Sequence, residues 1–397
     1  MAPRIACVEV NEDGTTGGSH RALELLAHGL GSAGFELVPV FYQDNRVAER
    51  LAAAGFDVRI LGALRAHERQ VNATGGLPER LVKAYRAVRD RADFLKHERI
   101  ALVHLNNSPF VGYDDWLPAS RMLGLPCVAT AMTRVAPTGR WPLRLLARRF
   151  DAYLPCSEYM ARSLQESGMP PGRTEVVHLG IDVEGFAQSA TKTRASMRAA
   201  LQVVADEFVV LMVGNLREWK GQHVVLDAVA RLPGALQSRV RVLLAGEASE
   251  RDRPYVQRLH DQAAHLHRPA SVTFLGTRGD VADLLTAADV MVHASIAPEP
   301  FGLVIVEAMA MGVPVVASDT GGPAEIIDEG SGILVPAGDA AQLGATLERL
   351  AADPELCRAL GSGGQRRAAV FSADNVAQAH AAIYRRLLAG RGAAPAT

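Results

Sequence analysis

The stretch PEPFGLVIVEAMAMGVPVVASDTGG, residues 298–322, predicts a helix, a turn and a buried strand in close succession. The apolar run after Gly302 has helical character, and we expect the helix to begin near Leu303. The valine-rich segment VPVVASD predicts the strand, which ends at a double glycine. Glu307 falls in the second turn of the predicted helix, and Glu299 lies in the loop before it. A helix that leads into a buried strand is typical of a parallel α/β sheet.

The alternation of apolar strands and periodic helices continues on both sides of this stretch. Further strands are predicted at residues 4–10 and at FELVPVFY, IALVHLNN, LPCVATAM, DAYLPCS, FVVLMVGN, RVRVLLAG, SVTFLG, DVMVHAS and ILVPAGD. A strand is also predicted at VVHLG, at the start of residues 176–186, where we place the linker between two halves. A long amphipathic helix is predicted over residues 77–98, with Leu81 on its apolar face.

Two successive strand–helix halves predict an α/β protein with two Rossmann-like domains, whose parallel sheets face a cleft between them. A chain of 397 residues is also too long for one ordinary core. The predicted domains are residues 1–178 and 179–373; a C-terminal helix covers residues 374–390, and residues 391–397 form a flexible tail. Ligands of such folds bind at the carboxyl ends of the strands, so the loops after the strands are the candidate site.

The composition indicates a soluble globular protein, with 48% hydrophobic and 21% charged residues. The formal net charge of −1 argues against a nucleic-acid partner. Four scattered cysteines form neither a disulfide framework nor a zinc pattern, which fits a reducing compartment. We find no signal peptide and no membrane-spanning run in the sequence, so we expect a cytoplasmic protein.

Anion-binding chemistry is predicted around Gly302. A helix N-terminus offers unpaired N–H groups and a partial positive charge, and glycine lets an anion approach the backbone closely. Glu299 and Glu307, on either side, could flank an elongated ligand with its phosphates between them. Lys220, between a strand and a helix in VGNLREWKG, is well placed to meet a diphosphate. The alternative for each residue alone is an ordinary loop or surface charge.

The stretch from 298 to 322 resembles the Glu-x7-Glu signature of glycosyltransferase family 4, a family of retaining enzymes with the two-domain GT-B fold. The resemblance covers nearly the whole chain and includes GGSHRALELLAHGL, VVHLGIDVEGF, VGNLREWKGQ, VLLAGEA and VTFLGTRGDVADLLTAADVMVHAS. It implies transfer of a sugar from a nucleotide-diphosphate sugar to an acceptor, with the anomeric configuration kept. It also implies an acceptor-binding N-terminal domain, a donor-binding C-terminal domain, and a C-terminal helix that crosses back to the N-terminal domain.

The resemblance implies a role for each residue of the signature. Glu307 would hold the ribose hydroxyls, and Glu299 would contact the donor sugar near its 3-hydroxyl. Gly302, Leu303 and Val304 would offer backbone amides to the donor. The chemistry agrees, because an ionised carboxylate accepts two hydrogen bonds from a vicinal diol.

The resemblance also points to a cationic loop around Lys220. Relatives usually pair this lysine with an arginine directly after the first glycine of the loop, where the chain has Asn215. Asn215 cannot supply charge, and we expect Arg217 to take that role beside Lys220. A solvated, charged loop is the alternative.

Two further loops match parts of the family that contact the donor. Gly17 and Gly18 correspond to a glycine pair that lets backbone amides approach the donor phosphate. The segment from Gly276 to Arg278 corresponds to the loop that receives the nucleobase. Ordinary loop glycines and a surface arginine are the alternatives. The chain has no G-x-G-x-x-G pattern at Gly17, so we reject a nicotinamide-binding interpretation.

The acceptor side is where the chain departs from the family. Met132 stands where many relatives have a histidine that contacts the donor sugar. His20, His104 and Asn106 lie at or near the carboxyl ends of predicted strands or in the first loop, and with Met132 they are the acceptor-side candidates. Each of the three polar residues could instead be structural. In a retaining mechanism the leaving phosphate itself can take the acceptor's proton, so the missing histidine is compatible with activity.

We expect neither a metal ion nor a cofactor. The sequence has no Asp-x-Asp pair of the kind that holds a divalent ion at a diphosphate, and the nucleotide-diphosphate sugar would be a co-substrate. The basic segment RWPLRLLARRF, residues 140–150, could contact an anionic membrane or a lipid-linked acceptor, or form a solvated cationic face. The acceptor, the base, the sugar and the oligomeric state are left open by the sequence.

Two other functions are compatible with the same motifs. One is a degenerate GT-B protein that binds a nucleotide sugar without transferring it, which Met132 and Asn215 would allow. The other is a GT-B sugar-nucleotide epimerase, which would need acid–base side chains around the sugar. The spacing of Glu299 and Glu307 favours the transferase.

Overall fold

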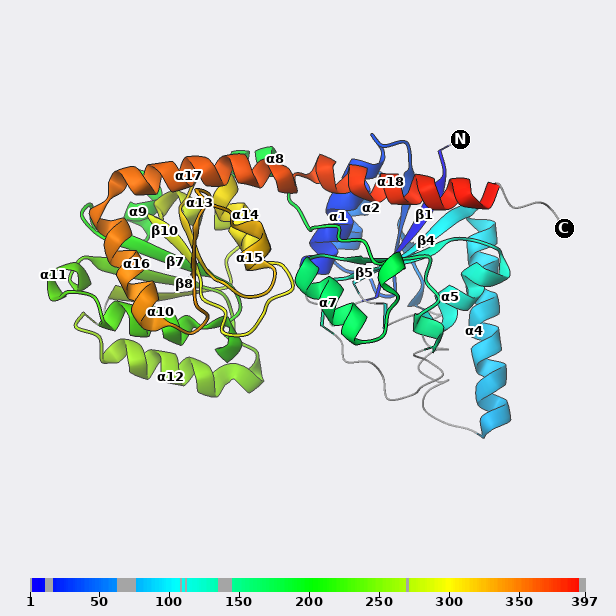
Figure 1. The fold of residues 1–397 in the computed structure, drawn as a ribbon, viewed down its shortest axis with the longest axis horizontal. Helices are drawn as coiled ribbons and strands as arrows, with labels where there is room; N and C mark the ends of the chain where they lie inside the picture. The colour runs from blue at the N-terminus through cyan, green and yellow to red at the C-terminus, as the bar shows by residue number, and fades with distance from the viewer. Residues whose placement is uncertain are drawn as a thin grey trace. The chain divides into compact units, whose positions relative to one another are not determined.

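The computed structural model describes residues 2–10, 17–62, 76–107, 109–110, 113–134, 145–268 and 271–392. The chain divides into two compact units (Figure 1). The N-terminal unit comprises Met1–Gly180 and Ala373–Thr397, and the C-terminal unit comprises Ile181–Ser372. Each unit has its own six-stranded parallel sheet, which confirms the predicted α/β class with two Rossmann-like parts.

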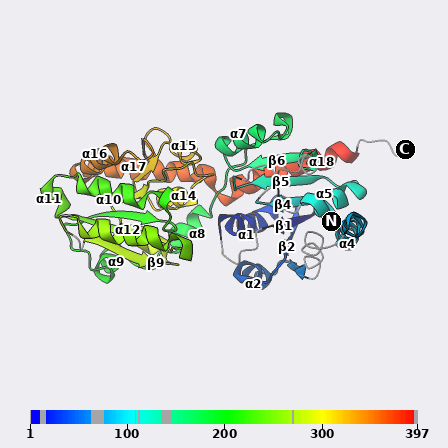
Figure 2. The same ribbon diagram turned by 90° about the horizontal axis from the view of Figure 1, so that it is seen from below.

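The sheet of the N-terminal unit has the strand order β3-β2-β1-β4-β5-β6, which can be followed from β2 to β6 in Figure 2. Its strands are β1 Arg4–Glu9, β2 Glu36–Phe41, β3 Arg59–Ile60, β4 Ile100–Asn106, β5 Cys127–Ala131 and β6 Ala152–Pro155. Its helices are α1 Gly18–Leu30, α2 Arg46–Ala53, α4 Leu77–His97, α5 Tyr113–Met122, α7 Glu158–Glu166 and α18 Ala373–Gly392. Residues 5–8 of the central strand β1 are fully buried, because helices cover both faces of the sheet.

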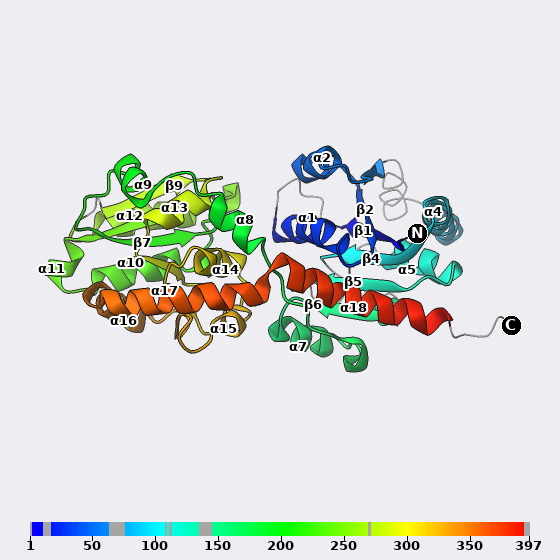
Figure 3. The ribbon, with the colours of Figure 1, turned by 90° about the horizontal axis from the view of Figure 1, so that it is seen from above.

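Helix α18 belongs to the N-terminal unit although it follows the C-terminal unit in the chain. It lies against α1 (Figure 3), and Gly29 permits the close approach because a Cβ there would lie 2.6 Å from the Cβ of Ala377. The hydroxyl of Tyr384 lies 2.6 Å from Nδ1 of His104 on β4. These contacts fix the helix that the sequence places at residues 374–390.

The predicted packing of α4 is wrong in its first half. The helix forms over Leu77–His97, as expected, but Leu81 is 63% exposed. The buried side chains of α4 all lie further along the helix: Ala87, Arg91, Ala92 and Leu95. Helical spacing of apolar residues therefore predicted the helix correctly, but not how much of it packs.

The sheet of the C-terminal unit has the strand order β12-β11-β10-β7-β8-β9. Its strands are β7 Phe208–Val213, β8 Val240–Ala245, β9 Val272–Gly276, β10 Val290–His293, β11 Val315–Ser318 and β12 Ile333–Val335. Its helices are α8 Val183–Gln188, α9 Arg194–Ala200, α10 Gln222–Ala230, α11 Gly234–Gln237, α12 Arg253–Ala264, α13 Val281–Ala287, α14 Leu303–Ala310, α15 Pro323–Ile326, α16 Ala340–Ala352 and α17 Pro354–Ala368. Figure 1 shows α10 and α12 on one side of this sheet and α9 and α13 on the other.

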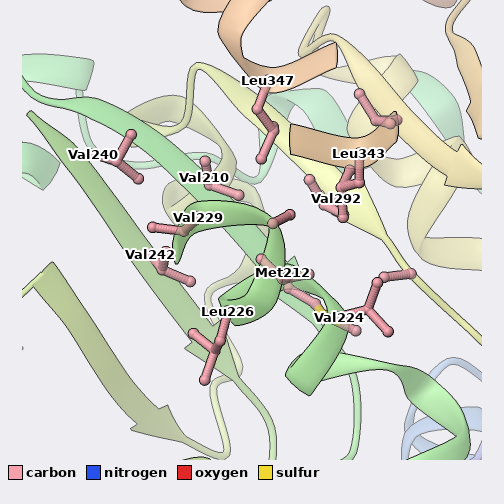
Figure 4. Close-up of a cluster of buried hydrophobic side chains, with 14 of the residues drawn as sticks. Val210, Met212, Val224, Leu226, Val229, Val240, Val242, Val292, Leu343 and Leu347 are labelled. Atoms are coloured by element: carbon pink, nitrogen blue, oxygen red, sulfur yellow. The ribbon is translucent and has the colours of Figure 1, made fainter. Parts of the chain in front are cut away.

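A cluster of buried aliphatic side chains holds the C-terminal unit together (Figure 4). Val210 and Met212 of β7 meet Val224 of α10, and Leu343 and Leu347 of α16 belong to the same cluster. Burial of side chains of this size stabilises a fold by about 1.5–3 kcal/mol each. The strands and helices that carry the candidate site are therefore anchored in a continuous core.

One predicted strand does not form as such. The segment VVHLG, residues 176–180, belongs to no strand of the sheet. Its backbone runs beside the end of β6, where the N–H of Glu175 donates to Tyr153 and that of Val177 donates to Pro155, each at 3.0 Å. These two bonds are too few for a ladder, and the chain then leaves the unit at Gly180.

Candidate active site

The topology of the C-terminal unit defines where its ligand crevice lies. In a sheet of this order, ligands bind outside the carboxyl ends of the strands at the point where the order reverses. Here that point lies between the adjacent strands β7 and β10, which pair in parallel, Val210 with Val290 and Leu211 with Met291. The loops after β7 and β10 carry Lys220 and Glu299, so the topology brings these two predicted site residues together.

Lys220 and Glu299 form a close ion pair at the carboxyl ends of these strands. The ammonium Nζ of Lys220 lies 2.7 Å from Oε1 and 2.8 Å from Oε2 of Glu299. Only 14% of the Lys220 side chain and 15% of the Glu299 side chain are exposed to solvent. Charged pairs of this geometry are shorter and stronger than neutral hydrogen bonds. The pair fixes both side chains beside the crevice.

Two residues that the sequence analysis did not single out also contact Glu299. Nε2 of His293, at the end of β10, lies 2.7 Å from Oε2 of Glu299. The hydroxyl of Ser295 donates to the same oxygen at 3.1 Å. The sequence does carry a signal for them, because His293 and Ser295 follow the apolar run VMV at the carboxyl end of the predicted strand, where ligands of such folds bind.

The surroundings of Glu299 favour the ionised form of its carboxyl group. Burial by itself raises the pKa of its carboxyl group, but His293 and Lys220 oppose this through charge and hydrogen bonding. The balance brings the pKa well below its usual range. Glu299 is therefore an acceptor of hydrogen bonds and a negative charge at this site, not a proton donor.

Glycines allow the loop of Lys220 to reach the loop of Glu299. Gly221 has a φ of +79°, and a Cβ at this position would lie 1.9 Å from the carbonyl oxygen of Ala294. The N–H of Ile296 donates to the carbonyl of Trp219 at 2.8 Å and ties the two loops together. Glycine is thus required at residue 221 both for its backbone conformation and for the close approach.

Replacing Gly221 with alanine is expected to lower the free energy of unfolding by about 3 kcal/mol, since backbone strain and a clash act together. Gly330→Ala is the matched control, because Gly330 has a φ of +86° but open space around a Cβ. That variant should lose only about 1 kcal/mol, from strain alone. Urea denaturation measures both, and equal losses would contradict the proposed close packing of the two loops.

The double glycine at the end of residues 298–322 closes on the loop of Glu299 from the other side. Glu299 pairs with Gly321 as an isolated parallel bridge, and the N–H of Gly322 donates to the carbonyl of Glu299 at 2.8 Å. A Cβ on Gly321 would lie 2.4 Å from that carbonyl oxygen. The regular placement of acids and glycines in the sequence thus reflects loops that pack backbone against backbone.

Helix α14 begins where the sequence predicts. Gly302 is its N-cap with a φ of +114°, and Leu303 is its first residue. No side chain caps this end, so the first N–H groups, including those of Leu303 and Val304, point out of the helix at its positive end. Glu307 lies in the second turn and is 5% exposed. These features suit an anionic ligand at the helix end.

Further contacts hold the loop after β7 in place. Nζ of Lys220 lies 4.5 Å from the centre of the Trp219 ring, a cation–π contact. The side chain of Gln222 donates to the carbonyl of Asn215 at 3.0 Å, and Tyr255 donates to Gln222 at 3.0 Å. Trp219 therefore packs on the lysine itself, a contact that the sequence did not reveal.

Arg217 lies in the same loop as Lys220 but has a different ionic partner. Its Nε lies 3.6 Å from Oδ2 of Asp252, beyond hydrogen-bond distance. Arg217 thus supplies a positive charge in the loop, and Asp252 balances part of that charge. Asn215, at the position where relatives carry arginine, is exposed.

The loop after β9 contains the predicted base-binding segment. Gly276 has a φ of +63°, and its carbonyl accepts from the N–H of Gly246 at 2.8 Å. The guanidinium of Arg278 binds both carboxylate oxygens of Asp280, at 2.7 and 2.6 Å. Arg278 is therefore held by an ion pair within its own loop, and the backbone around Gly276 remains the candidate contact for a base.

In the N-terminal unit, the predicted glycine pair lies at the start of α1. Gly17 is the N-cap and Gly18 the first residue of this helix. Among the described residues, a Cβ on Gly17 would meet no atom within 4 Å, so packing against them does not require glycine there. His20, in the first turn, is buried with 3% of its surface exposed.

His104, Asn106 and Met132 line one small pocket of the N-terminal unit, with a volume of about 10 Å³. This space holds about one water molecule. His104 is fully buried, and Asn106 donates to Glu9 at 2.6 Å and to the carbonyl of Ser19 at 2.9 Å. The structure thus gives His104 and Asn106 contacts inside the core, and it brings both close to Met132.

The described residues contain no group of three or more His, Cys, Asp or Glu side chains that could hold a metal ion. Within the same residues, no helix is long and apolar enough to cross a membrane. Residues 140–144 of the basic segment, including Arg140 and Arg144, lie outside the described residues. Arg148 and Arg149 are exposed.

Comparison with known proteins agrees with this architecture. The family model for glycosyl transferases group 1 matches residues 193–367 of this chain, and the model for Glycosyltransferase Family 4 matches residues 16–184. Among solved structures, HepE from Anabaena in complex with UDP and glucose superposes with a TM-score of 0.77 at 25% identity, over 96% of this chain and 99% of that one. The two units therefore form the GT-B fold of glycosyltransferases. The chain belongs to glycosyltransferase family 4.

The curated relatives carry a more specific name. The D-inositol 3-phosphate glycosyltransferase of Streptomyces bingchenggensis is 32% identical over 302 residues, which are 75% of this chain and 62% of that protein. The enzyme of the same name from Mycobacterium tuberculosis is 38% identical over 227 residues, which are 56% of this chain and 45% of that protein. The chain thus spans about half to three fifths of the length of these relatives.

Proposed function

We propose that this chain transfers a sugar from a nucleotide-diphosphate sugar to an acceptor, with retention of the anomeric configuration and without a bound metal ion. The observation that carries the proposal is the buried Lys220–Glu299 pair beside the N-terminus of α14. A cation, free helix N–H groups and an ionised carboxylate suit a diphosphate and the sugar attached to it. The nucleotide sugar would be the only co-substrate, with no cofactor.

The hydrogen bonds of the pair leave capacity for a ligand on both partners. An ammonium group has three N–H donors, and two of those of Lys220 point to the oxygens of Glu299. The third can meet a diphosphate oxygen. Oε2 of Glu299 is contacted by Lys220, His293 and Ser295, whereas Oε1 is contacted by Lys220. Oε1 is thus the oxygen that can accept from a sugar hydroxyl.

The chemistry then follows from charge. As the bond between the sugar and the diphosphate breaks, negative charge develops on the diphosphate and positive charge on the sugar. Lys220 and the N-terminus of α14 stabilise the negative charge on the diphosphate, and Glu299 stabilises the positive charge on the sugar. The acceptor hydroxyl attacks on the face that the diphosphate leaves, and a phosphate oxygen takes its proton. Met132 cannot take part in proton transfer, and this path does not require it to.

The relatives suggest where to look for the substrates. HepE has been crystallised with UDP-glucose, so UDP-glucose is the first donor to test. The curated relatives are named for D-inositol 3-phosphate, which makes this phosphorylated polyol the first acceptor to test. A lipid-linked acceptor that binds through the basic segment at residues 140–150 is a second candidate.

Proton NMR of the product tests the proposal. With a donor whose sugar is α-linked, the new glycosidic bond should also be α, and the rate should be unchanged by a chelator. An inverted product would overturn the retaining mechanism. Loss of activity with chelator, restored by a divalent cation, would overturn metal independence.

Glu307→Gln is expected to lower the affinity for UDP about tenfold to a hundredfold, because the charge-assisted hydrogen bonds to the ribose hydroxyls are lost. Titration calorimetry measures this effect. Inorganic diphosphate, which has no ribose, is the matched control ligand, and its affinity should be the same in both proteins. A variant that binds UDP as tightly as the parent would rule out the ribose-binding role of Glu307.

A further inference from the structure

His293 is a buried polar residue at the carboxyl end of an otherwise apolar strand. Its side chain is 3% exposed, and Nε2 lies 2.7 Å from Oε2 of Glu299. Glu299 is ionised and therefore only accepts hydrogen bonds, so Nε2 must carry the hydrogen. The imidazole thus donates to the same carboxylate that the proposed function places at the sugar.

No other polar contact accounts for the position of this ring. Nδ1 of His293 is buried and has no hydrogen-bond partner among the residues that the structure describes. Burying a polar ring costs free energy unless hydrogen bonds compensate it. Within the described part of the chain, the hydrogen bond of the His293 side chain goes to Glu299. A histidine that served only the core would be satisfied by the backbone or by neighbours away from the site.

Ser295 contacts the same oxygen from two residues further along the chain. Its hydroxyl is buried and donates to Oε2 of Glu299 at 3.1 Å. His293 and Ser295 therefore hold one oxygen of the carboxylate, and the Lys220 ammonium bridges both. Unlike Lys220, which would also bind the diphosphate through its third N–H, His293 and Ser295 can serve Glu299 alone.

We infer that His293 and Ser295 are positioning residues, which hold Oε2 of Glu299 so that Oε1 faces the donor sugar. The inference deepens the proposed function and rests on it. A carboxylate that must orient a sugar needs a fixed rotamer, and supporting hydrogen bonds provide it. Neither residue touches the reacting atoms, so the effect should appear in the chemical step and not in nucleotide binding.

His293→Leu removes the donor at similar volume, and His293→Gln keeps an N–H donor at the end of the side chain. The leucine variant should lower kcat about tenfold to a hundredfold, whereas the glutamine variant should lose less than about fivefold. The affinity for UDP should stay within about twofold of the parent in both. Ser295→Ala should lose about threefold in kcat. His265→Leu, at an exposed histidine of the same unit that bonds the carbonyl of Asp261 on its own helix, is the control and should behave as the parent.

The combination of His293→Leu with Glu299→Gln separates positioning from general damage. If the histidine acts through Glu299, the double variant should have the kcat of Glu299→Gln alone. Additive losses, or equal kcat for the leucine variant and the parent, would overturn the inference. In a protein with ¹⁵N-labelled histidine, the Nε2–H signal of His293 should also move upfield in Glu299→Gln.

This NMR signal does not depend on turnover. If the parent transferred no sugar from any donor, the proposed function would fail. The position of the Nε2–H signal would then decide on its own whether the histidine anchors the carboxylate. An Nε2–H signal that Glu299→Gln leaves unchanged would overturn the anchor.

Discussion

Glu299→Gln is expected to lower kcat about a hundredfold to a thousandfold, while the affinity for UDP changes by less than about fivefold. Glutamine has nearly the shape of glutamate but no charge, so it cannot stabilise positive charge on the sugar. In the proposed site the nucleotide would be held by other groups, among them Lys220 and the N–H groups at the start of α14. Steady-state rates at saturating donor give kcat, and titration calorimetry gives the affinity.

The matched control is Glu329→Gln, which removes the charge of an exposed acid in a turn of the same unit. This variant should keep the kcat of the parent. Melting temperatures of both variants ensure that the rates refer to folded protein. If Glu299→Gln turned over at the rate of the parent, Glu299 would have no part in the chemical step.

Lys220→Met should weaken UDP binding about tenfold to a hundredfold and lower kcat by a further hundredfold. In the proposed mechanism the lysine meets the diphosphate both before and after the bond to the sugar breaks, so its loss should affect binding and chemistry together. This distinguishes it from Glu299, whose loss should affect kcat alone. The same two measurements, calorimetry and steady-state rates, separate the two patterns.

Lys96→Met, at an exposed lysine of α4, serves as the control for loss of one positive charge. Lys220→Arg should not restore the parent rate, because the planar guanidinium cannot keep the geometry of Nζ with both oxygens of Glu299. If Lys220→Met bound UDP with the same affinity as the parent, the diphosphate would have to bind elsewhere.

Much of the fold could be predicted because it follows from local patterns. Short apolar runs between periodic helices predicted nearly every strand, and the start of α14 followed from Gly302 and the apolar run after it. The packing of α4 could not be predicted in the same way. Its apolar residues repeat along the whole helix, but how far the sheet extends beneath them is a property of the tertiary structure.

The candidate site was predicted in part. The loops of Lys220 and Glu299 follow strands that are neighbours at the switch point, so their proximity follows from topology once the strand order is known. The direct ion pair needed the structure, because 79 residues separate the partners in sequence. His293 was missed because a single polar residue at the end of a strand looks like part of the core. His104 was named from its place at the end of a predicted strand, with a structural role as the alternative; its contact with Tyr384, 280 residues away, needed the structure.

The most direct test of the account is release of nucleoside diphosphate from a panel of UDP-, GDP- and ADP-sugars, with chelator present and no metal added. The account predicts slow release from one donor by the parent and about a hundredfold less by Glu299→Gln. No release from any donor, together with no thermal stabilisation by any nucleotide, would contradict it. The chain would then be a member of the family that has lost the reaction.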